Sequence, residues 1–248
     1  MSESFFLQDN RALIDLQTYL ARASRAADGA VRLIASSGVI AAYTAILSPR
    51  GLTDTMPTVL GLRTFATRPE TQFDSVVPLR SLSDRLARVR DINLAADNGA
   101  EQDDPGVHDA AADRAEPFSL SLRVGLPLPV ATVMWAAISP PRGGWREVGH
   151  CAGEHLMSVA RDGIAEVAEA LPTNSGEHLV YKVRSEVWSR PIPELDFVPS
   201  GAAFAAHTLG FLAEGDDTVT VFENGSWTRL TTRRGHVLVH RPAWSLQV

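Results

Sequence analysis

The sequence predicts an α+β protein in which antiparallel strands and helices occupy separate blocks of the chain. Three observations support this fold class. Residues 31–79 hold short apolar runs between turn residues, residues 154–171 repeat apolar side chains at helical spacing, and residues 218–240 hold strand-like runs around an Asn-Gly dipeptide. We expect an antiparallel meander with flanking helices, then a helical middle, then a C-terminal three-stranded antiparallel meander.

The N-terminal block begins with an expected helix over residues 10–28, which Asp9 can cap. Its apolar residues Leu13, Leu16 and Leu20 recur on one face. Short apolar runs then predict four strands, over residues 31–35, 39–47, 58–67 and 72–79. The run 39–47 is nearly all apolar, so a buried helical segment is the alternative there. An amphipathic helix is expected over residues 81–90.

Residues 97–116 differ in composition from the rest of the chain. They are rich in Asp and Glu among Ala and Gly, without an aromatic residue, so they bury little apolar surface. We expect a mobile acidic linker or surface loop here. It separates a first part, residues 1–96, from a larger second part, residues 117–248, although the two parts can also form one domain.

The second part is expected to combine strands and helices. Gly163 lies within the apolar stripe of the helix 154–171. Glycine there lowers the stability of the helix by about 1 kcal/mol relative to alanine, so we expect the close approach of another element. The buried helix from Ser200 to about Leu212 is the expected partner. Asn224-Gly225 predicts a hairpin turn. The other expected elements are strands at 118–124, 131–139, 218–222, 226–231 and 236–240, and a helix at 177–190.

Composition excludes several classes of protein. The 248 residues carry a net charge of −6, which argues against a general nucleic-acid binder. Cys151 is the only cysteine, so the chain has no internal disulfide. No apolar run approaches the roughly 20 residues of a membrane span, and the first residues do not resemble a signal peptide. We expect a cytoplasmic protein that binds neither nucleic acid nor membrane.

Two segments resemble those of a known group of proteins. Ser-Pro-Pro-Arg-Gly-Gly-Trp at 139–145 and Glu-Val-Trp-Ser-Arg-Pro at 186–191 are similar to segments of uncharacterised actinobacterial hypothetical proteins. The resemblance implies a cytosolic bacterial protein. It implies no activity and no site residues.

The segment 139–145 is the first candidate site. Two prolines favour an extended backbone, and Gly143 and Gly144 then free the chain to turn beside Arg142 and Trp145. Backbone N–H groups near a helix start, together with an arginine, can hold a phosphate or carboxylate. The alternative is a tight connection in which Trp145 fills the core.

A second candidate is a metal site at the start of the central helix. Cys151 and His155 are four residues apart, so in a helix they share a face, and Glu154 can serve as a base beside them. His150 is one residue out of register, and a third ligand has to come from elsewhere. The alternative is a polar helix start with a small buried thiol. No cofactor is predicted.

Other histidines complete the list of candidates. His207 lies within an apolar helix, where it either acts as an acid or base or serves as a hydrogen-bonded core residue. His236 and His240 lie on the last strand, an even number of residues apart, and therefore face the same side.

Two function classes remain open. The sequence lacks the Gly-x-Gly-x-x-Gly, P-loop and Gly-x-Ser-x-Gly motifs, so we favour a non-catalytic binding or interaction protein, expected to be a homodimer. The alternative is a small-molecule enzyme, metal-assisted or not, that uses His150, Cys151 and His155, or His207. An enzyme should bring at least three candidate side chains into one concave pocket. These candidates are Arg142, His150, Cys151, His155, His207, His236 and His240.

Overall fold

The computed structural model confirms the α+β fold class. It describes residues 3–27, 29–51, 54, 56–100, 121–130, 133–172, 175–213, 215 and 218–241, with the side chains of 94–100 left aside. The helices are α1 (Asn10–Ala26), α2 (Leu79–Ala100), α3 (Gly153–Ala170), α4 (Glu177–Ser189) and α5 (Ser200–Thr208), with a short 3-10 helix at Met134–Ala137.

The strands fall into one large sheet and two short pairs. The first-half strands are β1 (Ser4–Leu7), β2 (Ala30–Ser36), β3 (Val39–Leu47), β4 (Thr58–Ala66), β5 (Phe73–Pro78) and β6 (Leu122–Gly125). The second-half strands are β7 (Arg146–Ala152), β8 (Pro191–Ile192), β9 (Leu195–Pro199), β10 (Thr218–Asn224), β11 (Trp227–Thr231) and β12 (His236–His240).

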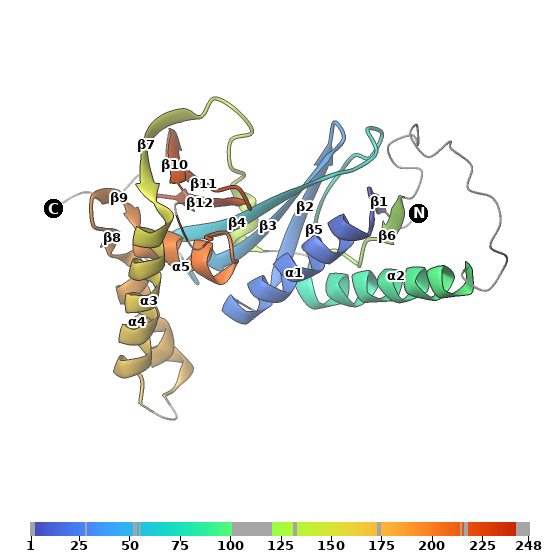
Figure 1. The fold of residues 1–248 in the computed structure, drawn as a ribbon. Coiled ribbons are helices and arrows are strands. Elements are labelled where there is room, and N and C mark those ends of the chain that lie inside the picture. The colour runs from blue at the N-terminus through green and yellow to red at the C-terminus, as the bar shows by residue number, and fades with distance from the viewer. Residues whose placement is uncertain are drawn as a thin grey trace.

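The large sheet has eight antiparallel strands in the order β5-β2-β3-β4-β12-β11-β10-β7 (Figure 1). Strand β4 pairs with β12, in a register that sets Leu60 opposite Leu238, so strands from the two halves of the chain form one sheet. The predicted four-strand meander holds for β2, β3 and β4. Strand β5 instead returns to pair with β2, which leaves β4 free to pair with β12.

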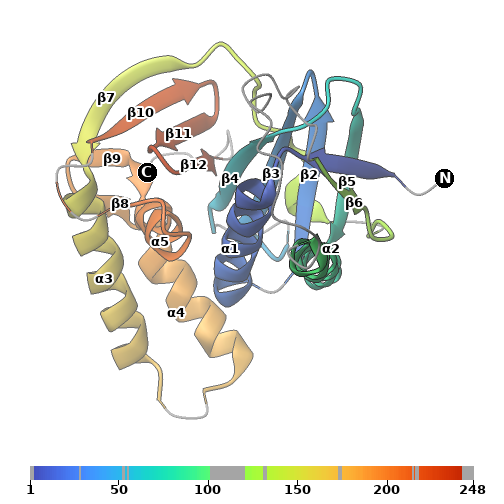
Figure 2. The same ribbon diagram turned by 45° about the vertical axis from the view of Figure 1, so that its right-hand side comes forward.

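One face of the sheet, called here the inner face, packs against helices. Figure 2 shows α1 and α2 side by side next to the strands of the first half, while α3 and α4 extend away from the sheet as a pair. Helix α5 lies between these groups and contacts both β4 and β12. One buried cluster runs beneath the whole sheet, from Phe5 and Leu16 to Val237 and Val239.

Helix α1 begins as its sequence predicts, whereas α2 begins two residues earlier than the expected residue 81. The Oδ1 atom of Asp9 accepts a hydrogen bond from the N–H of Ala12 at 2.8 Å, which confirms the cap of α1. Helix α2 is longer than expected and runs to Ala100, four residues into the predicted linker. Alanines in this stretch favour helix, and this local preference extends α2. Residues 101–116 of that predicted linker lie outside the described residues.

Two predictions near the middle of the chain are wrong. In residues 133–139, the described part of the strand expected at 131–139, the chain forms the 3-10 helix instead. The segment at 139–145 leads into β7 rather than into a helix. Apolar side chains of this region, Trp135 and Trp145, pack against the second face of the sheet. Covering that face outweighs the strand preference of the local sequence.

The C-terminal hairpin forms, but with a shifted turn. Asn224 pairs with Trp227, so the two loop residues are Gly225 and Ser226 rather than Asn224 and Gly225. Gly225 has a φ of +57° and Ser226 does not take a positive φ, as expected of a type II′ loop. The Asn224 side chain instead donates to the carbonyl of Gly143 at 2.8 Å.

The close approach expected at Gly163 is present, and α5 packs against α3 as expected, but the atoms nearest to Gly163 come from α4. A Cβ atom added there would lie 2.4 Å from Cζ3 of Trp188, which belongs to α4 and not to α5. Trp188 is fully buried and stacks on Phe204 of α5 at 4.5 Å between ring centroids. The indole therefore fills the space between three helices.

Among the described residues, no helix is both long enough and apolar enough to cross a membrane.

Replacing Gly163 by alanine tests this packing. A methyl group gains about 1 kcal/mol in helix propensity, but overpacking against the rigid Trp188 ring costs about 1–3 kcal/mol. We expect a net loss of stability in urea unfolding. Glu169→Ala, at an exposed position of the same helix, is the control and should change stability by less than about 0.5 kcal/mol. A stabilised Gly163→Ala variant would contradict the packing described here.

Candidate functional site

Residues 133–145 form a strap across the outer face of the sheet, the face opposite to α1 and α5. Just before it, the N–H of Val130 donates to the carbonyl of Val76 in β5. Arg32 of β2 then donates from Nη1 to the carbonyl of Ala136 and to Oγ of Ser139, both at 2.8 Å. At the other end, Asn224 of β10 holds Gly143. The strap is thus held at one end by β2 and at the other by β10, each next to an edge strand of the sheet.

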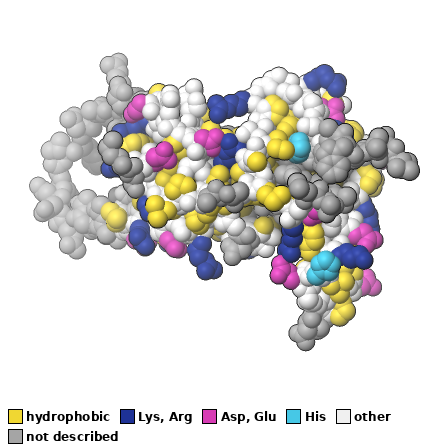
Figure 3. All heavy atoms as spheres, turned by 180° about the vertical axis from the view of Figure 1, so that it is seen from behind, with side chains coloured by type: hydrophobic (Ala, Val, Ile, Leu, Met, Phe, Trp, Pro, Cys, Tyr) yellow, Lys and Arg dark blue, Asp and Glu magenta, His cyan; other side chains and the backbone are white. Residues whose placement is uncertain are grey.

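The outer face carries a second, smaller apolar cluster beneath the strap. Tyr43, Leu60, Trp227 and Leu238 are its buried members, and they come from four neighbouring strands. The partly buried side chains packed on it are Ile34, Ala41, Ala45, Leu62, Trp135 and Trp145. Seen from behind, the molecule shows a broken band of apolar side chains with Lys and Arg side chains beside it (Figure 3).

A cavity of about 420 Å³ lies between the strap and this face. Its floor is apolar, and its walls carry two arginines, one histidine and several hydroxyl groups. The lining residues are Ile34, Ser36, Ser37, Val39, Ala41, Tyr43, Leu62, Thr64, Pro140, Pro141, Arg142, Trp145, Arg229, His236 and Leu238. Such a combination of apolar surface and few polar groups is typical of small-molecule sites.

Arg229 of β11 is the most unusual group in the cavity wall. Its guanidinium carbon lies 4.6 Å from the ring centroid of Trp145 and 4.5 Å from that of Phe222. Its Nε atom is buried and has no hydrogen-bond partner among the described residues. Burial lowers the pKa of the guanidinium from its usual value, yet arginine stays protonated. A partly buried cation with an unpaired Nε favours an anionic partner.

Arg142 and His236 complete the polar wall. Arg142 is exposed on the strap, and the described residues make no ion pair with it. Burial, with Arg229 and Arg63 nearby, lowers the pKa of His236 to about 4, so this ring is neutral at neutral pH. Its Nδ1 lies 3.1 Å from Oγ1 of Thr231. The positive charge of the cavity therefore comes from the two arginines.

The cavity contains part of the first predicted site. Arg142 and Trp145 line it, whereas Gly143 and Gly144 do not. A Cβ atom at Gly144, where φ is +74°, would lie 3.2 Å from Nδ2 of Asn224, so these glycines serve the docking of the strap. The helix start expected beside them is absent because β7 follows.

The geometry assumed for a metal site is wrong. Cys151 belongs to β7 and His155 to α3, so the two side chains do not share a helical face. Burial raises the pKa of the Cys151 thiol to about 11, which disfavours the thiolate that binds metals. His155 Nε2 lies 3.1 Å from the carbonyl of Pro193, and His150 pairs with Glu147. Within the described ranges no three metal-ligating side chains gather.

The remaining histidines lie elsewhere. His207 is on α5, where burial and then Arg161 lower its pKa. His240 packs on Trp227 at 4.8 Å between ring centroids. Of the seven candidates weighed for an enzyme, only Arg142 and His236 line one cavity.

Sequence reasoning did not find Arg229 or Tyr43. Strand alternation offered a signal for Arg229, because it lies two residues after Trp227 and faces the same side. The run Val39–Leu47 offered another, since a strand that is apolar on both faces needs cover on both. Neither pattern indicates which segment provides that cover.

Two family models match this chain, each over less than half of its length. Residues 1–106 match a domain of unknown function, DUF8010, and residues 140–244 match another domain of unknown function, DUF8185. No curated protein matches the chain.

Several solved structures are similar in overall arrangement. A DNA polymerase sliding clamp from Caulobacter crescentus shares 13% identity at a TM-score of 0.45, over 99% of this chain and 67% of that one. A sliding clamp from Bacillus subtilis shares 8% at 0.46, over 100% and 67%. The DNA polymerase III subunit beta from Pseudomonas aeruginosa shares 12% at 0.41, over 96% and 64%. Likeness at this level says nothing about what this chain binds.

The low pKa of His236 predicts a pH-dependent stability. The unfolded chain takes up a proton near pH 6.5 and the folded chain only near pH 4, so protonation favours unfolding between these values. Stability that is present above pH 6.5 should fall by on the order of 2–3 kcal/mol as the pH drops to 4. Urea unfolding at several pH values measures it. His236→Gln should remove this part of the decline, and an unchanged decline would contradict the assignment.

Proposed function

We propose that this chain is a non-catalytic binding protein that holds an organic anion in the cavity between the strap and the sheet. The observation that carries the proposal is the pair Arg142 and Arg229 above an apolar floor. Arg229 is partly buried between two aromatic rings, and its buried Nε lacks a described partner. A ligand carboxylate or sulfonate would neutralise the guanidinium charge of Arg229 and accept a hydrogen bond from its Nε.

The shape and lining of the cavity support a ligand with an apolar, flat body. Tyr43 and Trp145 supply aromatic surface, and Leu62 and Leu238 supply aliphatic surface on the strand side. Aromatic rings stack well on such surfaces, and burying apolar area contributes roughly 25 cal/mol per Å². The acidic group of the ligand then lies toward the two guanidinium groups.

Binding rather than catalysis is favoured by the state of the titratable groups. A general base works best with a pKa near the working pH, and His236 has a pKa of about 4. Burial raises the pKa of Tyr43, which keeps its hydroxyl protonated. The cavity therefore offers a fixed positive charge and neutral donors, a combination that suits recognition.

The proposal extends to the cellular location and the oligomeric state of the chain. A net charge of −6 favours a small ligand over nucleic acid. We assign the chain to the cytoplasm of a bacterium of the actinobacterial type that its sequence resembles. We also propose a homodimer: β7 ends the sheet with one edge unpaired in the described part of the chain, and such edges favour association.

Isothermal titration with 2-naphthoate tests the ligand site. This probe combines a flat apolar body with one carboxylate, and its neutral carboxamide is the matched ligand control. We expect naphthoate to bind and the carboxamide to bind about tenfold more weakly, because a hydrogen bond to a charged group contributes about 1.5–3 kcal/mol. Equal binding of both compounds would contradict a cationic site.

Two variants locate the binding. Arg142→Gln and Arg229→Gln should each weaken naphthoate binding about tenfold and leave carboxamide binding unchanged. Arg146→Gln is the control, because Arg146 is an exposed neighbour that pairs with Glu223 and does not line the cavity. A loss of affinity in Arg146→Gln equal to that in Arg142→Gln would indicate a general charge effect and refute the assignment.

Light scattering coupled to gel filtration tests the assembly. A homodimer should elute with about twice the chain mass of 26.8 kDa at micromolar protein and should dissociate on dilution if the edge contact is weak. A mass of one chain throughout a concentration series up to the millimolar range would reject the dimer without affecting the ligand site.

A further inference from the structure

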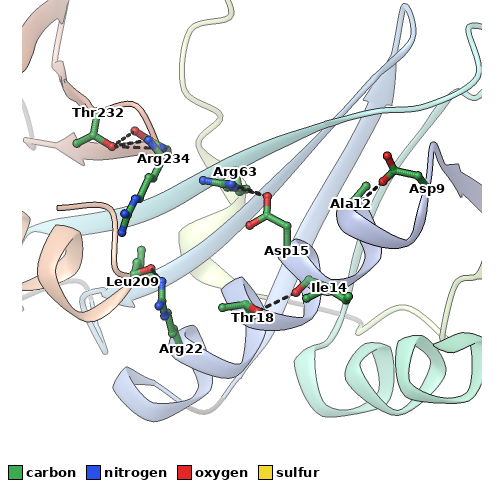
Figure 4. A network of polar contacts seen from close by, with 11 residues as sticks. Asp9, Ala12, Ile14, Asp15, Thr18, Arg22, Arg63, Leu209, Thr232 and Arg234 are labelled. Carbon is green, nitrogen blue, oxygen red and sulfur yellow. Dashed lines mark hydrogen bonds and ion pairs between the residues drawn. The ribbon is translucent and has the colours of Figure 1, made fainter. Parts of the chain in front are cut away.

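A second cavity lies on the inner side of the sheet, where α1, β4 and the turn between β11 and β12 meet α5. Its volume is about 250 Å³. The lining residues are Asp15, Thr18, Tyr19, Arg22, Arg63, Leu209, Gly210, Phe211 and Arg234. Three of these are arginines from three separate elements, and Figure 4 shows them approaching the same space.

Two of the arginines are held in place by hydrogen bonds that use only some of their N–H groups. Arg63 donates from Nε at 3.0 Å and from Nη2 at 2.5 Å to one oxygen of Asp15, which leaves Nη1 without a described partner. Arg22 donates from Nη1 at 3.2 Å to the carbonyl of Leu209. Its position depends on Gly210, where φ is +68° and an added Cβ atom would lie 2.0 Å from Nη1.

The third arginine is exposed and is positioned only through its backbone. The N–H of Arg234 donates to Oγ1 of Thr232 at 3.1 Å, and the guanidinium group makes no described ion pair. Three positive groups therefore surround a small space with one carboxylate, Asp15, whose charge already faces Arg63.

We propose that this cavity binds a small tetrahedral oxyanion of the phosphate class. Guanidinium groups that approach from three directions match the acceptor oxygens of such an ion, whereas the acceptor oxygens of a carboxylate lie in one plane. The size and mainly polar lining of the cavity distinguish it from the apolar space beneath the strap, so the two sites take different ligands. The phosphate comes either from the free ion or from a small phosphate ester.

Thermal unfolding in inorganic phosphate, with sodium chloride used to hold the ionic strength constant, tests this inference. A ligand that binds the folded chain raises the melting temperature in a saturable way. Arg234→Gln should shift the half-saturating phosphate concentration upward about tenfold, since it removes charge-assisted hydrogen bonds but no described contact of the fold. Arg22→Gln should act in the same direction.

Arg233→Gln is the matched control, because Arg233 is exposed next to Arg234 and does not line the cavity. Its phosphate response should equal that of the wild-type protein. A wild-type protein without a saturable response would overturn the inference. So would equal responses of Arg233→Gln and Arg234→Gln. A parallel series with glycerol 3-phosphate separates the two sources, since tighter binding than inorganic phosphate identifies an ester and weaker binding identifies the free ion.

Discussion

The need to cover two apolar faces of one sheet is the constraint on which the rest of this structure depends. Along β4 and β12, Val59 and Val239 belong to the inner core, while their neighbours Leu60 and Leu238 belong to the outer cluster. Helices α1, α2 and α5 cover the inner face. In the described part of the chain, the strap is the cover of the outer face, and a strap covers less area than a layer of helices. The cavity beneath it is the space that this incomplete cover leaves.

The strap is held by hydrogen bonds at one end and by a cation–π contact at the other. Arg32 fixes its first half and pairs with Asp74, which in turn has its pKa lowered mainly by that hydrogen bond. Arg229 contacts its last residue, Trp145, through the face of the ring. A cation–π contact contributes about 0.5–2 kcal/mol. The guanidinium group is partly buried, and its buried Nε still lacks a described hydrogen-bond partner. The proposed anionic ligand would supply that partner, and ligand binding would then be linked to the position of the strap at Arg229.

Local patterns predicted most helices and strands, because each needs only the side chains within it. Asp9 and the spacing of Leu13 and Leu16 define α1, and Gly163 does mark a close approach. The elements that were predicted wrongly are those in which contacts with residues far away in the sequence outweigh the local preference. Trp135 lies in a 3-10 segment because the outer cluster takes its side chain. Asn224 leaves the hairpin turn because it donates to Gly143, 81 residues away.

The site was predictable only in part for the same reason. Arg142 and Trp145 stood out because their local sequence is unusual, but their neighbours in the cavity come from β2, β3, β4, β11 and β12. The pairing of β4 with β12, which brings Leu62 beside His236, has no local signal. The helical face assumed for Cys151 and His155 does not form, because β7 ends at Ala152 and the helix of His155 begins only at Gly153.

The most direct measurement of the central claim is the tryptophan indole region of a proton–nitrogen correlation spectrum during titration with 2-naphthoate. Trp145 lines the cavity and Trp227 belongs to its floor cluster, whereas Trp188 is buried between α3, α4 and α5. The account predicts that the indole resonances of Trp145 and Trp227 shift in a saturable way while that of Trp188 stays fixed. A fixed Trp145 resonance, or a shift that is largest at Trp188, would contradict a ligand site beneath the strap.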